Sequence, residues 1–352
     1  MSLARQAFLV SVIVVGVVAT ALALWHLRLL IFLFFLGLTW SAAMRPGVER
    51  LNRLGVPRAA GVLIHFGAVA AVIALLLWLA VPQAISQVQH AIGDLPTSKT
   101  ELRDAAKTST GIKHDLLIDL RRQLDDLPSG SALIHPTITI TRTALEVLVG
   151  IFFTLATAAY WIFERDRAAR LVLSALPRER RRTVRATWDL IDLKLGAFVR
   201  GQLLMITFVS VTLSGAFALI GLPFWLLLGV FAGIVEMVPV VGPLAAGTLA
   251  VGVGLSVDWR HALYAAIAVW GLRLLQDYLI NPHVFGHVTG LSPLIVLVTV
   301  SALGLLLGGV YVLLSVPLAS VLATLVDVIV LDRDPEHQAA PTVLFPAKDA
   351  EG

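Results

Sequence analysis

The ten residues Leu29–Leu38 read LLIFLFFLGL and carry no polar side chain. A transmembrane β-strand alternates apolar and polar residues, and this run does not. Similar runs recur along the chain, and a run of about 18 residues or more can cross about 30 Å of hydrocarbon as an α-helix. Because lipid offers the backbone no hydrogen-bond partner, helix is the form expected for these runs. The sequence therefore predicts an all-α polytopic membrane protein with about eight transmembrane helices, some of them broken or re-entrant.

The composition also indicates a membrane protein. Of the 352 residues, 58% are hydrophobic and 14% are charged, and the mean hydropathy is +0.87. Soluble domains are about 45–50% apolar and about 25% charged. The chain has no cysteine, which excludes disulfides and thiolate metal sites. The net charge of +4 is expected to report membrane topology, so the expected partner is the lipid bilayer and not nucleic acid.

The distribution of apolar and polar residues predicts four segments. Residues 1–81 form an N-terminal three-span region, and residues 82–141 form a polar insert. Within the insert, apolar residues recur at helical spacing, which predicts two amphipathic helices outside the membrane. Residues 142–331 form a C-terminal transmembrane block with a basic linker at 164–200, and residues 332–352 form a disordered cytoplasmic tail.

The basic residues predict the orientation of the chain. Arg5, the arginines of residues 45–58 and the basic linker fall on one side of the membrane if two spans separate each from the next, and the insert falls on the other. Short loops rich in Lys and Arg stay cytoplasmic, so both termini are expected in the cytoplasm. The span count stays open because the runs 223–257 and 291–331 are interrupted. Counting each half as a crossing gives about ten spans, and one re-entrant hairpin gives about eight.

Glu236 is the first candidate functional residue. It lies in GIVEMVPVVGP, residues 233–243, where Pro239, Gly242 and Pro243 cannot continue a regular helix without freeing carbonyls. Within lipid, freed carbonyls are tolerated only where protein or water meets them. A carboxylate beside such a break is typical of transporters that bind ions or polar solutes. The alternative is a surface loop in which Glu236 is hydrated.

Three polar residues interrupt a later apolar run. Arg273, Gln276 and Asp277 lie at i, i+3 and i+4 and so share one helical face. Arg273 can neutralise Asp277 or pair with Glu236, and such charges within a span usually face a cavity or a partner. The alternative is an internal ion pair with no role in transport. The run then ends at Asn281 and Pro282.

The sequence carries no enzyme signature and no clear metal site. The metalloprotease, serine hydrolase and phosphate-loop motifs are absent, so we expect no catalytic residue and no cofactor. His283 and His287 lie at i, i+4 and could bind a metal or sense protons. Without a third ligand nearby they are interpreted as surface residues. Small residues four apart, Gly229–Gly233 and Gly304–Gly308, allow close helix contact.

The stretch Glu236-Met-Val-Pro-Val-Val-Gly-Pro243 resembles the signature Glu-x-hydrophobic-Pro-x-hydrophobic-Gly-Pro of the autoinducer-2 exporter-like family. Further matches are Arg200-Gly201-Gln202, Gln276-Asp277 with Pro282 and Gly286, Leu291-Ser292-Pro293-Leu294, Gly308-Gly309, and Val316-Pro317-Leu318-Ala319. The resemblance covers most of the chain and is most specific over residues 181–326. One departure is the order Gln276-Asp277, where many members have Glu-Asn.

The resemblance implies a multi-pass protein of the cell inner membrane with about eight spans and cytoplasmic termini. Some members are linked to export of the furanone signal autoinducer-2 and others to sodium–proton antiport, and a homo-oligomer is implied by analogy. The leading hypothesis is a secondary transporter that moves a small polar solute, such as an autoinducer-2-like signal, or an ion. Its expected path residues are Glu236, Arg273, Gln276, Asp277 and Asn281. Its expected helix-break or gating residues are Pro239, Gly242, Pro243, Pro282, Pro293, Gly308, Gly309 and Pro317. The alternatives are a sodium–proton antiporter, in which a proton or sodium ion is the partner, and a non-transporting scaffold.

Overall fold

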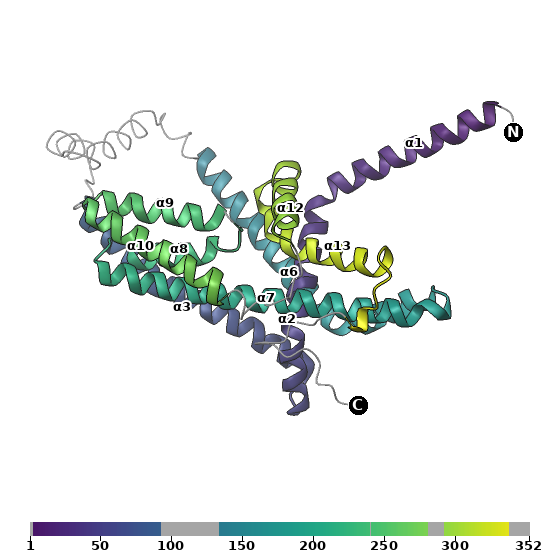
Figure 1. The fold of residues 1–352 in the computed structure, drawn as a ribbon, viewed down its shortest axis with the longest axis horizontal. Helices are drawn as coiled ribbons and strands as arrows, with labels where there is room; N and C mark the ends of the chain where they lie inside the picture. Colours follow the sequence, from purple (N-terminus) through teal and green to yellow (C-terminus); the bar gives the residue numbers. More distant parts are fainter. Residues whose placement is uncertain (1–2, 93–133, 240, 281–291, 338–352) are drawn as a thin grey trace. The chain divides into compact units, whose positions relative to one another are not determined.

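The computed structural model describes residues 3–92, 134–239, 241–280 and 292–337, and these residues form helices and turns without a strand (Figure 1). The N-terminal helices are α1 (Leu3–His26), α2 (Arg28–Arg53), α3 (Arg58–Ile92), α6 (Ile134–Ser174) and α7 (Arg178–Ile220). The C-terminal helices are α8 (Trp225–Val235), α9 (Val241–Leu255), α10 (Trp259–Leu275), the π-helix η1 (Gln276–Ile280), α12 (Pro293–Leu306), the 3₁₀ helix η2 (Gly309–Leu314), α13 (Ser315–Ile329) and the 3₁₀ turn η3 (Pro335–His337).

Many of these helices are long and apolar enough to cross a bilayer. Within the described ranges there are six of them. They are Arg28–Arg53, Arg58–Leu76, Leu145–Ser174, Arg178–Ile220, Trp259–Ile280 and Gly309–Ile329. Shorter apolar helices are Ser11–His26, Trp225–Val235, Val241–Leu255 and Leu294–Leu306. The predicted all-α polytopic membrane fold is therefore confirmed.

Several helices continue beyond the apolar runs that predict them. Helix α2 passes Pro46 and ends at Arg53, so most of the basic stretch expected as a loop is helical. Helix α3 passes Pro82 and ends at Ile92, so the first residues of the polar insert continue a transmembrane helix. A proline inside a helix removes one hydrogen bond and does not always end it. Hydropathy marks where a helix leaves the hydrocarbon, whereas the helix itself can continue into water.

The predicted four-segment division stays a prediction. Most of the polar insert and most of the C-terminal tail lie outside the described residues, which stop at Ile92, resume at Ile134 and stop again at His337. The second predicted amphipathic helix of the insert and the disorder of the tail fall there. By contacts the chain instead groups into two compact units, each made of separate stretches. One contains residues 1–43, 149–196 and 290–338, and the other contains residues 44–148, 197–289 and 339–352.

The unit that contains α8, α9 and α10 has a continuous apolar core. These three helices lie side by side, with α9 packed against both α8 and α10 (Figure 1). The buried core residues are Val209, Leu213, Phe217, Leu222, Leu228, Ala232, Ala246, Ala250, Ala265 and Leu272. Alanines on α9 and α10 allow these two helices to lie close together. Lipid provides no hydrophobic driving force for helix association, so the association depends on tight packing.

Helix α8 packs on α7 through its two predicted small positions. A Cβ on Gly229 would lie 2.4 Å from the backbone nitrogen of Ser214, and one on Gly233 would lie 2.5 Å from the carbonyl oxygen of Ile206. Neither position can therefore carry a side chain without moving a backbone. The predicted close contact at Gly229–Gly233 is confirmed, and it fixes where α8 ends relative to α7.

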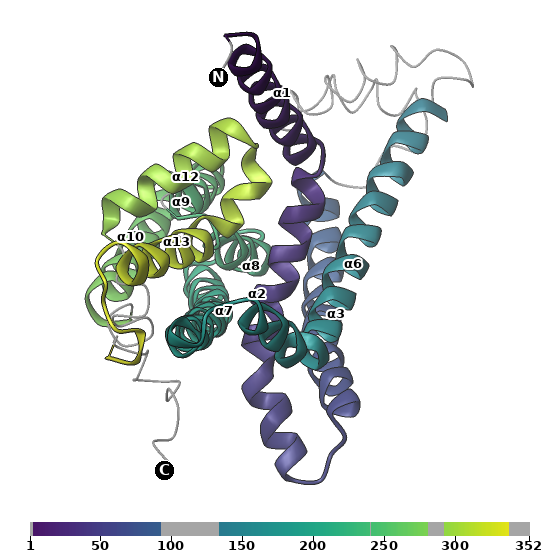
Figure 2. The same cartoon turned by 90° about the vertical axis from the view of Figure 1, so that its right-hand side faces the viewer.

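The unit that contains α12 and α13 packs through aromatic and small residues. Helices α12, η2 and α13 contact one another (Figure 2). The rings of Phe32 and Tyr311 meet edge to face at 4.9 Å, and those of Trp161 and Trp188 stack at 6.1 Å. The buried Lys194 of α7 donates from Nζ to Oγ1 of Thr324 on α13 at 2.9 Å. The Lys194–Thr324 hydrogen bond thus joins α7 to α13, whereas the aromatic pairs join α2 to η2 and α6 to α7.

Candidate solute site at the α8–α9 turn

The turn from α8 to α9 is tight because Gly242 lies directly against the end of α8. Its amide donates to the carbonyl of Val238 at 2.9 Å. A Cβ at Gly242 would lie 1.9 Å from the carbonyl oxygen of Val235. Only glycine allows this approach. The signature glycine of the predicted motif therefore holds Glu236, the residue after Val235, at the tip of a helical hairpin.

The two helices of this hairpin are short for a membrane crossing. Helix α8 has 11 residues and α9 has 15, which corresponds to about 16 Å and about 22 Å at about 1.5 Å per residue. The hydrocarbon layer is about 30 Å thick. These lengths favour a re-entrant hairpin over two full crossings, which is the arrangement that yields the lower of the two predicted span counts.

The carboxylate of Glu236 meets the polar face of the next helix. Nη1 of Arg273 donates to Oε1 of Glu236 at 3.3 Å, and Nε2 of Gln276 donates to the same oxygen at 3.3 Å. Nε of Arg273 also pairs with Oδ2 of Asp277 at 3.0 Å. The Glu236 side chain is 14% exposed and Gln276 is 3% exposed. Arg273 thus pairs with both Glu236 and Asp277, the two alternative partners that the sequence indicated.

The backbone changes form at this point. Helix α10 ends at Leu275, and the next five residues, Gln276–Ile280, form a π-helix. Single π turns inside helices are frequent at functional sites because they shift side chains out of α-helical register. Along α10 and η1, Arg273 lies about 21 Å from Trp259 at about 1.5 Å per residue. The site is therefore inside the candidate span Trp259–Ile280 and past its middle.

The other predicted gating residues lie at helix breaks or outside the described residues. Pro239 is in the α8–α9 turn and Pro243 is in the first turn of α9. Pro293 begins α12. Gly308, with a φ of 111°, separates α12 from η2, which begins at Gly309. Pro317 is buried in the first turn of α13. Asn281 and Pro282, as well as His283 and His287, lie in 281–291, outside the described residues. The gating role of these glycines and prolines stays a prediction.

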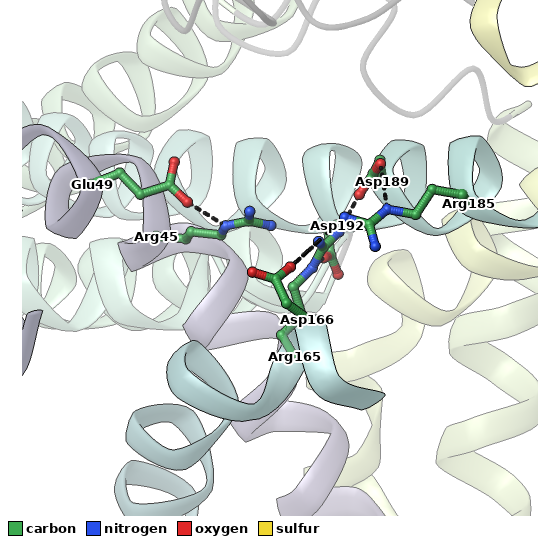
Figure 3. A network of polar contacts seen from close by, with 7 residues as sticks. All are labelled: Arg45, Glu49, Arg165, Asp166, Arg185, Asp189 and Asp192. Carbon is green, nitrogen blue, oxygen red and sulfur yellow. Dashed lines mark hydrogen bonds and ion pairs between the residues drawn. The ribbon is translucent and has the colours of Figure 1, made fainter. Parts of the chain in front are cut away.

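A second polar cluster, which the sequence reasoning did not single out, joins α6 and α7 (Figure 3). Arg165 of α6 has a side chain only 4% exposed, and it donates to Asp189 and Asp192 of α7 and to Asp166. Arg185 pairs with Asp189 at 3.3 Å. In the sequence these charges read only as a basic linker. The available signal was the i, i+3 spacing of Asp189 and Asp192, which places two carboxylates on one face of a helix.

Outside the spans, Asp258 caps the start of α10. Its Oδ1 accepts a hydrogen bond from the amide of His261 at 2.8 Å and lies 2.9 Å from Nδ1 of the same residue. The backbone hydrogen bond from His261, followed by the hydrogen bond to its side chain, lowers the pKa of Asp258. An ionised N-cap also interacts favourably with the helix dipole. The loop between α9 and α10 thus ends in a defined helix start.

Long apolar helices, a half-length helical hairpin and charged side chains that meet beside it define a multi-pass membrane transport protein. The family model for AI-2E family transporters matches residues 12–331, and the chain belongs to that family. It is 24% identical over 298 residues to "Putative transport protein YrrI" of Bacillus subtilis (strain 168), which covers 80% of this chain and 81% of that protein. It is 26% identical over 318 residues to "Putative transport protein MT0215" of Mycobacterium tuberculosis (strain CDC 1551 / Oshkosh), which covers 87% and 84%.

These comparisons confirm the resemblance to the autoinducer-2 exporter-like family and assign the chain a transport role rather than an enzymatic one. The matched region contains the α8–α9 hairpin, α10 and the α12–α13 break. The family assignment supports the membrane and a small solute as partners.

Proposed function

We propose that the protein is a secondary transporter that moves a small polar solute or ion past Glu236, Arg273, Gln276 and Asp277. One observation carries the proposal. A largely buried carboxylate is held at the tip of a hairpin of two half-length helices, and it faces an arginine and an amide on a helix that is itself interrupted. Transporters bind ions and polar solutes at such discontinuous helices, where backbone carbonyls and charged side chains are both available.

The charges of the site favour some solutes over others. Glu236 and Asp277 contribute two negative charges and Arg273 contributes one positive charge, so the site carries a net negative charge. An anion would be repelled in a low-dielectric environment. A small cation, or a neutral polar solute such as a hydroxylated furanone that donates hydrogen bonds, fits this site better. The autoinducer-2-like signal and the sodium or proton of an antiporter are both in these classes.

The membrane and the orientation are part of the same proposal. We place the protein in the inner membrane with both termini cytoplasmic, because the arginine-rich stretches at 45–58 and 164–200 are expected on the cytoplasmic side. Assembly into a homo-oligomer is proposed by analogy with the family. Native mass spectrometry of the detergent-purified protein would reveal a monomer if that part is wrong.

The test is solute flux in proteoliposomes with Glu236→Gln. The substitution keeps the shape of the side chain and removes its charge, so we expect at least a tenfold loss of flux with unchanged folding by size-exclusion chromatography. The matched control is Glu49→Gln on α2, because Glu49 pairs with Arg45 at 2.6 Å but is 44% exposed. The control should transport normally. Equal flux from the two variants would remove Glu236 from the mechanism.

The scaffold alternative predicts the reverse result. If partner binding through the polar insert is the function, deletion of residues 96–128 should abolish activity in cells while Glu236→Gln has no effect. We expect the opposite result, with activity lost in Glu236→Gln and kept after the deletion. A transporter depends on the Glu236 charge inside the membrane, whereas a scaffold does not.

A further inference from the structure

The contacts of Arg273 with its two carboxylates are unequal. Its Nε lies 3.0 Å from Asp277, four residues along the same helix, whereas its Nη1 lies 3.3 Å from Glu236 on the hairpin. Charge-assisted N–H···O bonds are usually about 2.7–2.9 Å long. Arg273 therefore keeps a carboxylate partner on its own helix when its 3.3 Å contact with Glu236 is broken.

Glu236 retains capacity for another positive group. Both of its side-chain hydrogen bonds end on Oε1, and no residue in the described part of the chain bonds Oε2. An ionised carboxylate has about four lone-pair sites. Glu236 has spare acceptor sites and a single arginine contact of 3.3 Å. It is therefore incompletely neutralised, which is costly in a low-dielectric environment.

The surrounding groups suit a singly charged cation. The described residues contain no group of three or more His, Cys, Asp or Glu side chains that could hold a metal ion. Transition-metal and calcium sites require several such ligands. A monovalent cation needs fewer charged ligands and can complete its coordination with carbonyls of interrupted helices. One added positive charge would also make the group of Glu236, Arg273 and Asp277 neutral.

From these contacts we infer that Arg273 is a tethered substitute for a monovalent substrate cation. The cation binds Glu236 by displacing the Arg273 guanidinium, which stays paired with Asp277. When the cation leaves, Arg273 returns to Glu236. In the empty site Glu236 then always has a positively charged partner, so the unloaded transporter can change its access from one side of the membrane to the other. This inference rests on the proposed function and assigns its substrate class.

The inference predicts opposite effects for two neutralising substitutions. Arg273→Gln removes the competitor, so the apparent Kd for Na⁺ should fall at least tenfold, whereas Glu236→Gln should abolish Na⁺ binding. Binding is measured by thermal unfolding of the purified full chain in NaCl against N-methyl-D-glucamine chloride at constant ionic strength. Weaker or unchanged Na⁺ binding by Arg273→Gln would overturn the inference.

Transport gives a second readout. With ²²Na⁺ in proteoliposomes, Arg273→Gln should keep exchange of Na⁺ against Na⁺ but lose net Na⁺ efflux at least tenfold, because Glu236 in its empty site has no arginine to pair with and the site cannot reorient. Loss of both modes, or retention of both, contradicts the role given to Arg273. Flux of a neutral solute that depends on Glu236 but not on Na⁺ would overturn the inference and leave the proposed function intact. Absence of any Glu236-dependent flux would count against both.

The chain has no cysteine, which permits a charge-restoration control. In Arg273→Cys, reaction with the ethylammonium methanethiosulfonate reagent should restore wild-type Na⁺ affinity and net efflux, and the neutral methyl reagent should not. A measurement on the wild type covers the case in which these variants fail to fold. Millimolar guanidinium chloride should compete with Na⁺ for the wild-type site, since the free ion matches the Arg273 head group. Na⁺ binding that guanidinium does not affect would overturn the inference without any variant.

Discussion

Substitution of Gly242 by alanine adds only one methyl group, but it should strongly disturb the contacts of Glu236. The added Cβ would lie 1.9 Å from the carbonyl oxygen of Val235 and 3.1 Å from the amide of Glu236. An ordinary contact begins at 3.4 Å, so the start of α9 and the end of α8 must separate by about 1.5 Å. Overpacking of this kind costs about 1–3 kcal/mol. The same displacement would stretch the 3.3 Å contacts of Glu236 beyond hydrogen-bonding distance.

The matched control is Gly252→Ala in the same helix. A Cβ at Gly252 meets nothing within 4 Å, and replacing glycine by alanine inside a helix stabilises it by about 0.5–1 kcal/mol. The two variants should therefore differ by about 1.5–4 kcal/mol in the free energy of unfolding, measured by SDS titration in mixed micelles. Gly242→Ala should also lose flux while Gly252→Ala keeps it. Equal stability and equal flux would refute the close approach at Gly242.

Two further predictions concern charges outside the proposed solute site. Arg165→Gln should destabilise the protein by about 3 kcal/mol, because it breaks a buried ion pair and removes the cation that Asp189 and Asp192 share. Asp192→Asn should cost about 1 kcal/mol, because Asp189 and Asp166 remain to neutralise Arg165. SDS titration would contradict this if Asp192→Asn proved the worse variant. The lowered pKa of Asp258 means that its stabilising effect is complete above its unfolded pKa of about 3.9 and disappears as the pH falls through the lower folded value. The Tm difference between wild type and Asp258→Asn should therefore shrink as the pH falls from about 5 to about 3, the range around the unfolded pKa of an aspartate. A Tm difference independent of pH would contradict the role of Asp258 as a helix cap.

The sequence predicted the fold class because hydrophobic runs and the bilayer thickness set it together. It also predicted one candidate site that contains Glu236, Arg273, Gln276 and Asp277. A charged side chain inside an apolar run usually faces a partner or a cavity, which favours such a group. The bounds of the helices were less predictable. Pro46 and Pro82 do not end their helices, because helix termination depends on how the freed groups are satisfied in three dimensions and not on the proline alone.

The Arg165 cluster shows what a charge count conceals. In the sequence, residues 164–200 are a basic linker, and its arginines predict a cytoplasmic location for this segment. In the structure Arg165 is buried and its partners come from the next helix, 24 and 27 residues away. Only the fold brings them together. Net charge predicts on which side of the membrane this segment lies, but it does not separate Arg165, which joins α6 to α7, from the other arginines of the segment.

Gln276 and Asp277, adjacent in the π turn, contact different partners. Gln276 is buried and faces Glu236, to which it donates a hydrogen bond, whereas Asp277 faces Arg273. The order Glu-Asn, which many members of the family have, would place a second carboxylate against Glu236. It would also remove the carboxylate at position 277 that pairs with Arg273. Two carboxylates in contact cannot both ionise easily. In this chain the neutral amide at position 276 instead donates a hydrogen bond to Glu236, and the acid at position 277 pairs with Arg273. The departure from the family pattern therefore moves a negative charge from position 276, next to Glu236, to position 277, next to Arg273. In this arrangement one arginine pairs with two carboxylates.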